Sequence, residues 1–245
     1  MDFNTGGGSG RPDDRPLYGE ERGGPARGPA SGPGRSPGGE FNLQDPINSF
    51  VGTVRTLVLN PVGFFRGIAR RGDFVNPLIF AAICALISAL LGGIINLALS
   101  PLFAGPGDTG GEVLAGGIAG FVTNLIFTPV FVVILLAIGA AITHLLVMLL
   151  VRPQNAGFEA TFRVGAYSQV AQLIGWIPII GWIVAVVWVI VLSIFGIREL
   201  HTTTTGRAAL VVLIPVAILF LLLFLLFAII AAVIGGAIMS EGQQF

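Results

Sequence analysis

Long uncharged apolar runs, separated by short polar connections, make up most of the chain after residue 76. A helix needs roughly 20 such residues to cross a hydrocarbon core of about 30 Å. The runs therefore predict an all-α integral membrane protein with five transmembrane helices. These spans are expected at about 77–99, 118–150, 160–177, 180–198 and 208–236.

Helix-breaking residues lie in or between several of the expected spans. Pro129 lies inside the second run and Pro215 near the start of the fifth, so both helices are expected to bend or tilt. Segment 176–182, with the sequence Trp-Ile-Pro-Ile-Ile-Gly-Trp, predicts a tight hairpin at the outer membrane interface, because Pro and Gly favour a turn and Trp favours the interface. The first limb of this hairpin, 160–177, is short and polar, and whether it crosses fully stays open.

Amphipathic patterns precede the first expected span. The pairs Asp45-Pro46, Asn60-Pro61 and Asn76-Pro77 each place a capping side chain before a proline, and each predicts a helix start. Two amphipathic interfacial helices are expected within 45–73. Their apolar stripes either bury in lipid or cover the cytoplasmic ends of the spans. The stripes consist of Ile47, Phe50, Val51, Val54, Leu57 and Val58, and of Val62, Phe65, Ile68 and Ala69.

The N-terminal segment has a different composition from the rest of the chain. Residues 1–40 are rich in glycine, proline and charged residues and contain almost no large apolar residues. Such a segment cannot bury enough surface to offset the entropy of ordering it. Residues 1–44 are therefore expected to form a disordered cytoplasmic tail, either passive or acting as a docking arm through 25–37.

Composition and net charge disfavour two broad classes of protein. Of the 245 residues, 54% are hydrophobic and 11% are charged. Soluble domains are about a quarter charged, so an ordinary water-soluble enzyme is disfavoured. The net charge of zero argues against a nucleic-acid-binding protein. Residues 74–240 are assigned to one transmembrane domain.

Arginine is distributed asymmetrically over the expected topology. The chain has no lysine, and its arginines after residue 45 all fall on the N-terminal side of the membrane if the chain crosses five times. The positive-inside rule then places the N-terminus in the cytoplasm and the C-terminus outside. Arg66, Arg70 and Arg71 flank the second amphipathic stripe and are candidate contacts for anionic lipid headgroups.

Candidate chemistry inside the spans is limited to uncharged polar side chains and one histidine. The absence of Asp, Glu and Arg deep in any expected span disfavours a proton- or ion-coupled transporter. No catalytic motif or metal-ligand spacing occurs, so no enzymatic activity, metal or other cofactor is predicted. The intramembrane polar candidates, which either bond between helices or line a path, are Asn124, His144, Tyr167, Gln169 and Gln172.

Several short stretches, in this order and spacing, resemble the Yip domain family of Ypt/Rab-interacting proteins, and in particular its bacterial branch. They are 60–66 (Asn-Pro-Val-Gly-Phe-Phe-Arg), 158–163 (Phe-Glu-Ala-Thr-Phe-Arg) followed by Tyr167-Ser168, 177–181 (Ile-Pro-Ile-Ile-Gly), 196–201 (Gly-Ile-Arg-Glu-Leu-His) and 205–208 (Thr-Gly-Arg-Ala). The resemblance covers about residues 55–235. It implies a five-span helical protein with a cytoplasmic N-terminal region and, through the bacterial branch, a location in the bacterial inner (plasma) membrane.

The resemblance implies a function without catalysis. Eukaryotic members of the family are tied to vesicle trafficking, Rab binding and membrane shape, and the Rab partners are not carried over to this chain. We therefore expect a non-enzymatic multi-pass membrane protein that organises the membrane or partner proteins. The alternative is a small transporter or channel with a polar path between helices. The expected partners are the lipid bilayer with anionic headgroups, and a protein partner or a second copy of the chain, but no nucleic acid.

Overall fold

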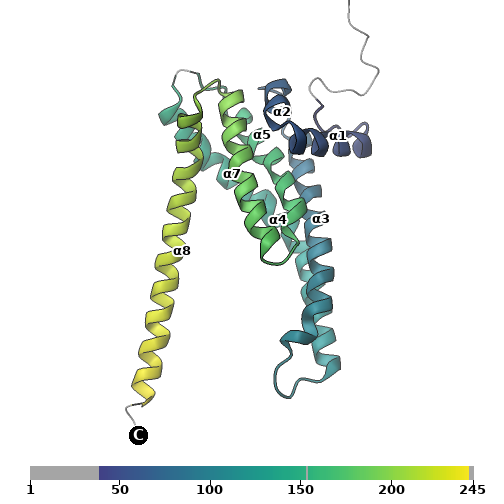
Figure 1. The fold of residues 1–245 in the computed structure, drawn as a ribbon, viewed down its shortest axis with the longest axis vertical. Helices are drawn as coiled ribbons and strands as arrows, with labels where there is room; N and C mark the ends of the chain where they lie inside the picture. The colour runs from purple at the N-terminus through teal and green to yellow at the C-terminus, as the bar shows by residue number, and fades with distance from the viewer. Residues whose placement is uncertain (1–38, 153, 243–245) are drawn as a thin grey trace, which may run out of the picture. The chain divides into compact units, whose positions relative to one another are not determined.

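A computed structural model describes residues 39–152 and 154–242, with side chains as far as Val233, and all regular structure in these ranges is helical. This confirms the all-α prediction, while the expected tail at residues 1–38 lies outside the described residues. Two short 3-10 turns, Ser100–Phe103 and Gln169–Ala171, complete the elements. The helices are α1 (Pro46–Leu59), α2 (Pro61–Gly67), α3 (Val75–Leu99), α4 (Gly110–Leu150), α5 (Phe158–Ser168), α6 (Gln172–Gly175), α7 (Ile180–Leu200) and α8 (Thr205–Gly242) (Figure 1).

Four helices in the described part of the chain are long and apolar enough to cross a membrane. They are Val75–Phe103, Gly110–Leu150, Ile180–Leu200 and Thr205–Val233. The expected span at 160–177 is not one of them, because this stretch is divided into α5, a 3-10 turn and α6. The Ser168 hydroxyl donates to the carbonyl of Val164 at 2.7 Å where α5 ends, and this type of bond tends to bend a helix.

The proline-marked helix starts agree with the structure at two positions and differ at the third. Helices α1 and α2 begin at Pro46 and Pro61, and Asn60 accepts a hydrogen bond from the backbone N–H of Gly63 at 3.0 Å. Helix α3 begins at Val75 rather than at Pro77. Its first turn is bonded by Asp73, whose carboxylate accepts from the N–H of Asn76 at 3.2 Å. Both Pro129 and Pro215 lie within continuous helices, α4 and α8.

A strained turn connects α6 to α7, in the segment that the sequence predicts as a hairpin. The N–H of Ile180 donates to the carbonyl of Pro178 at 2.7 Å, and Ile179 between them has φ +63°. This is a γ-turn, which is rare for a β-branched residue with positive φ and costs about 1–3 kcal/mol. Gly181 follows at a point where any side chain would overlap the carbonyl oxygen of Ile174. The local fold therefore requires glycine at position 181.

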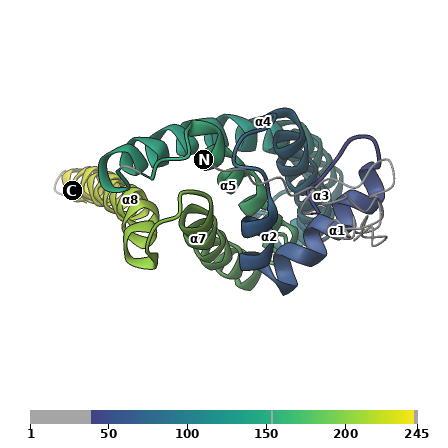
Figure 2. The same cartoon turned by 90° about the horizontal axis from the view of Figure 1, so that it is seen from above.

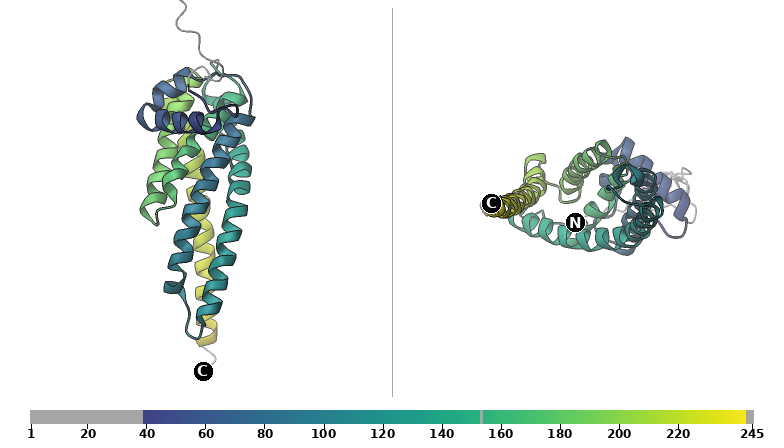
Figure 3. Two further views of the ribbon diagram at one scale, coloured as in Figure 1. Left: turned by 90° about the vertical axis from the view of Figure 1, so that its right-hand side faces the viewer. Right: turned by 90° about the horizontal axis from the view of Figure 1, so that it is seen from below.

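Helices α3 and α4 form a long antiparallel pair (Figures 1 and 3). Small residues let the two backbones approach each other. A side chain on Gly93 would overlap the ring of Phe121, and one on Gly117 would contact Leu97 and Ser100. At these positions the glycine-rich stretches serve packing within the chain.

Helix α8 packs on the rest of the chain only near its start. Ala208, Val211 and Val212 are buried, where α8 contacts α7 and α4. From Ala217 to Val233 its side chains are exposed, and the other described helices leave this length of α8 uncovered. Such a surface is stable only in contact with lipid or with another apolar helix.

The tightest packing lies at the end of the bundle where α1 and α2 lie beside the start of α3, as seen from above in Figure 2. We call this the charged end. Phe41 is 1% exposed and packs against the rings of Phe50 and Phe80, with centroids 6.4 and 6.0 Å away. Residues 39–44 therefore differ from the predicted tail, since burial of Phe41 offsets the entropy of ordering them.

Candidate functional site

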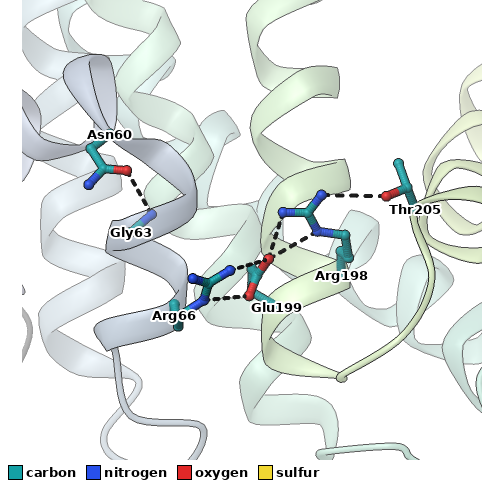
Figure 4. A network of polar contacts seen from close by, with 6 residues as sticks. All are labelled: Asn60, Gly63, Arg66, Arg198, Glu199 and Thr205. Carbon is teal, nitrogen blue, oxygen red and sulfur yellow. Dashed lines mark hydrogen bonds and ion pairs between the residues drawn. The ribbon is translucent and has the colours of Figure 1, made fainter.

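Three polar clusters occupy the charged end of the bundle, and each joins elements that are far apart in the sequence. The first, drawn in Figure 4, is centred on Glu199 near the end of α7. Arg66 Nε donates to its carboxylate at 3.1 Å, and Arg198 Nη2 donates at 2.6 Å. Arg198 also bonds the hydroxyl of Thr205 at 3.4 Å. The cluster thus joins α2, α7 and the start of α8.

The Glu199 cluster is open to solvent on the arginine side. The side chain of Arg66 is 70% exposed and that of Glu199 is 14% exposed. Ion pairs with one exposed partner contribute about 0–1 kcal/mol to stability. The main effect of the Glu199 cluster is electrostatic, because its two arginines and one carboxylate have a net positive charge. The exposed residues Arg70 and Arg71 add to the positive charge of this end.

The second cluster is a chain of hydrogen bonds between two histidines. The N–H of Ala156 donates to His201 Nδ1 at 3.1 Å, so the proton of a neutral ring must lie on Nε2. Nε2 then donates to the Thr161 hydroxyl at 3.1 Å, and this hydroxyl is free to donate to His144 Nδ1 at 3.0 Å. The chain links α4, α5 and the end of α7.

His201 is fully buried and therefore strongly favours its neutral form. Burial, with smaller contributions from the nearby His144 and Arg70, lowers its pKa from 6.5 to about 4. In the described ranges, no group of three His, Cys, Asp or Glu side chains is placed to hold a metal ion. The geometry of this cluster is that of a structural hydrogen-bond chain with fixed donors and acceptors.

The third cluster is a buried ion pair between Glu40 and Arg163. Arg163 Nη2 lies 2.5 Å from the Glu40 carboxylate, with side-chain exposures of 2% and 14%. The same carboxylate oxygen accepts from the N–H of Ala69 at 3.2 Å, and Arg163 Nη1 donates to the carbonyl of Asp73 at 3.2 Å. Arg163 thus holds the segment before α1 and the loop before α3 against α5.

The structure disperses the polar residues that the sequence singles out. Asn124 bonds Thr128 at 2.9 Å, and Gln172 bonds Gln169 at 3.4 Å. Tyr167 is fully buried against the rings of Phe64 and Phe80, while His144 belongs to the histidine chain. The arginine candidates Arg66, Arg70 and Arg71 are all exposed at the charged end.

Sequence reasoning missed three members of the clusters. Glu40 falls within the predicted tail, and Thr161 lies in stretch 158–163, which was used only for the family resemblance. Arg163 was counted among the arginines on the cytoplasmic side, although it falls within the expected span 160–177, and it lies inside α5. The one available signal was the apolar character of its neighbours, Phe162 and Val164, which indicates a buried position.

Comparison with known proteins gives one finding. The family model of the Yip1 domain matches residues 55–239, which include the second part of α1 and all of α2 to α7. No curated protein and no solved structure shows a significant match. The matched range covers well over half of the chain and contains all four long apolar helices.

Proposed function

Because the chain belongs to the Yip1 domain family, we propose that it is a non-enzymatic, five-span membrane protein that organises the surrounding membrane, or partner proteins held there, through its charged end. The proposal places the N-terminus in the cytoplasm, the C-terminus outside, and the protein in a bacterial plasma membrane. The observation that carries it is the exposed apolar face of α1, which lies beside exposed arginines.

Contacts at the charged end support five crossings. Arg66 before α3 bonds Glu199 near the end of α7, and Ala156 after α4 bonds His201 after α7. The start of α3, the end of α4 and the end of α7 therefore share one side of the membrane. Helices α4 and α7 can both end there only if the chain returns between them through α5 and α6. The arginines at these positions then all face the cytoplasm, as the positive-inside rule requires.

The topology predicts where the C-terminus lies. A reporter that is active only in the cytoplasm, fused after Phe245 of the full-length chain, should be inactive, because a fifth crossing carries it outside. A reporter active only outside should give signal at the same position. A fusion that is inserted in the membrane and active in the cytoplasm contradicts the five-span proposal.

The apolar stripe of α1 is divided between two environments. Leu57 is fully buried against the bundle, with Phe50 and Val54 half-buried beside it. On the adjoining part of the helix surface, Ile47 is 76% exposed and Val51 is 59% exposed. Apolar surface of this kind is stabilised by about 25 cal/mol per Å² when it leaves water. The division supports both interpretations of the stripe at once, packing on one flank and lipid on the other.

Exposed arginines next to α1 suit an anionic bilayer surface. Arg55 lies on α1, and Arg70 and Arg71 lie in the loop before α3. Neither Arg70 nor Arg71 forms an ion pair with the residues that the structure describes. Each arginine near an anionic surface contributes about 1 kcal/mol of attraction, which salt screens.

The transporter alternative is less well supported by the cavities. Asn124 lines both of the cavities found along α3 and α4, but His144, Tyr167, Gln169 and Gln172 line neither of them. Tyr167 is instead sealed among aromatic rings. His144 bonds Thr161 of α5, and Gln169 and Gln172 bond each other, so these polar groups are engaged within the chain.

A fluorescent probe on α1 tests the lipid-facing proposal. In a Cys84→Ser background, an environment-sensitive dye on Val51→Cys of the full-length protein, in nanodiscs with anionic lipid, should show apolar emission and quenching by lipids brominated on their chains. The same dye on the polar position Thr56→Cys should be quenched less, since this residue lies about 140° around the helix from Val51. Water-like emission at position 51 without quenching contradicts the proposal.

A further inference from the structure

A short non-helical segment, residues 39–44, lies at the charged end before α1 begins, and we call it the strap. It bonds to two helices that follow it. The hydroxyl of Thr53 on α1 donates to the carbonyl of Gly39 at 2.9 Å, and the N–H of Leu43 donates to the side chain of Asn76 on α3 at 3.4 Å. The strap therefore joins α1 to the start of α3.

The surface that receives the strap has a charged part and an aromatic part. Arg163 on α5 lies 2.5 Å from the Glu40 carboxylate, and its side chain is 2% exposed. The next residue of the strap, Phe41, packs on the ring of Phe80, which in turn contacts the ring of Tyr167 with centroids 5.3 Å apart. Two adjacent residues of the strap thus engage a buried cation and an aromatic wall.

The charged part has more hydrogen-bonding capacity than the strap uses. The Glu40 carboxylate accepts from Arg163 Nη2 and from the N–H of Ala69 through the same oxygen, Oε1. Arg163 Nε and the Tyr167 hydroxyl, one turn apart on the same face of α5, are buried and have no partner among the described atoms. Buried polar groups in permanent contacts are nearly always paired. These two donors therefore favour a site that takes a ligand.

The strap precedes the part of the chain that the family model matches. The match begins at residue 55, so Glu40 and Phe41 lie before it, whereas Arg163, Phe80 and Tyr167 lie within it. The matched domain thus buries an arginine whose carboxylate partner comes from a preceding segment. A charge that is buried without a partner is costly, so Arg163 requires a carboxylate whenever this site is closed.

We propose that Arg163, Phe80 and Tyr167 form a docking site for a short segment with a carboxylate followed by an aromatic ring, and that the strap is its releasable occupant. Release of the strap breaks the links from α1 to α3 and α5, while the packing of α1 on α2 remains. Docking of the strap therefore controls how firmly α1 is held on the bundle. The inference rests on the proposed function only for the role of α1 at the membrane surface.

Thiol labelling of the full-length protein in detergent tests whether the strap opens by itself. In a Cys84→Ser background, Thr53→Cys should react with a water-soluble thiol reagent while Val151→Cys stays protected. Both positions are fully buried, but Thr53 is bonded to the strap, whereas Val151 lies at the end of α4 and becomes accessible only on wider unfolding.

Two charge-neutralising variants make the labelling specific. Glu40→Gln should speed labelling at position 53 by about 10- to 100-fold, the factor expected when a hydrogen bond between charged groups is weakened. Glu199→Gln makes the same chemical change in the exposed cluster and should leave this rate unchanged, because opening of the strap does not disturb that cluster. Equal labelling rates at positions 53 and 151 overturn the proposal.

A free peptide of residues 36–44 tests the docking site itself. Full-length protein carrying Glu40→Gln and Phe41→Ala should bind this labelled peptide at least about tenfold more tightly than the wild type, whose own strap competes at high effective concentration. Fluorescence anisotropy measures the binding. A native peptide that binds this variant no better than peptides with Glu40→Gln or Phe41→Ala also contradicts the proposal. Lipid quenching of the dye at position 51 reports the proposed function separately.

Discussion

Replacement of Glu40 by alanine should lower the free energy of unfolding by about 3–5 kcal/mol, the usual cost of leaving one member of a buried ion pair without its partner. Arg163 is 2% exposed in its side chain, and Glu40 is the carboxylate that neutralises it. The substitution also removes the acceptor for the N–H of Ala69. The effect is measured on the full-length protein in detergent micelles or bicelles, by reversible unfolding or steric trapping.

A second substitution distinguishes loss of the pair from loss of packing. Combining Glu40→Ala with Arg163→Met removes both charges. The double variant should regain much of the unfolding free energy that Glu40→Ala loses, since apolar replacements of buried ion pairs are often neutral or stabilising. Arg66→Ala serves as the control for an exposed pair and should cost about 1 kcal/mol or less. If Glu40→Ala proves no more destabilising than Arg66→Ala, the pair does not anchor the segment before α1.

Acidification should destabilise the protein through His201. Its folded pKa of about 4 lies below the unfolded value of 6.5, so the unfolded chain binds more protons between these values. The stability contributed by neutral His201 is therefore complete above pH 6.5 and is lost as the pH falls toward 4. Between pH 7.5 and pH 4.5 the loss should reach roughly 2–3 kcal/mol, since one pKa unit corresponds to about 1.4 kcal/mol.

The control for this effect is a variant that cannot titrate at position 201. His201→Gln should be less stable than the wild type at pH 7.5, because it disrupts the bonds to Ala156 and Thr161. The difference in unfolding free energy between the two proteins should become smaller as the pH falls. Carboxylates titrate in both proteins, so this change in the difference reports His201 alone. If the unfolding free energies of the wild type and His201→Gln fall by the same amount over this pH range, the buried imidazole does not control the acid sensitivity of the protein.

Local signals in the sequence predict the long helices and the joints between them. The apolar runs give α3, α4, α7 and α8, because length and hydrophobicity alone determine whether a helix can cross a membrane. Asn60-Pro61 gives the start of α2, since capping depends on residues within one turn. The Trp-flanked Pro and Gly of segment 176–182 give the turn between α6 and α7.

Local sequence signals do not predict the contacts between residues that are far apart in the chain. Glu40 and Arg163 are 123 residues apart, and no local pattern pairs a glutamate of a glycine-rich segment with an arginine of a later helix. The change from α5 to a 3-10 turn follows Ser168, whose hydroxyl bonds back to its own helix, and hydropathy does not register such a bond. The histidine chain likewise requires Thr161 to lie between α4 and the end of α7.

The apolar helices of this chain differ greatly in length, and a bilayer of one thickness cannot match them all. Helix α7 has 21 residues and spans about 32 Å, whereas α8 has 38 residues and spans about 57 Å. A hydrocarbon core of about 30 Å fits α7 but leaves α8 in positive hydrophobic mismatch, which tilt of the helix or local stretching of acyl chains must relieve. Lipids along α8 are therefore under more strain than lipids along α7. Acyl-chain length should thus act on this protein mainly through its two longest helices, α8 and the 41-residue α4, and should bias its lateral partition toward thicker regions of the membrane.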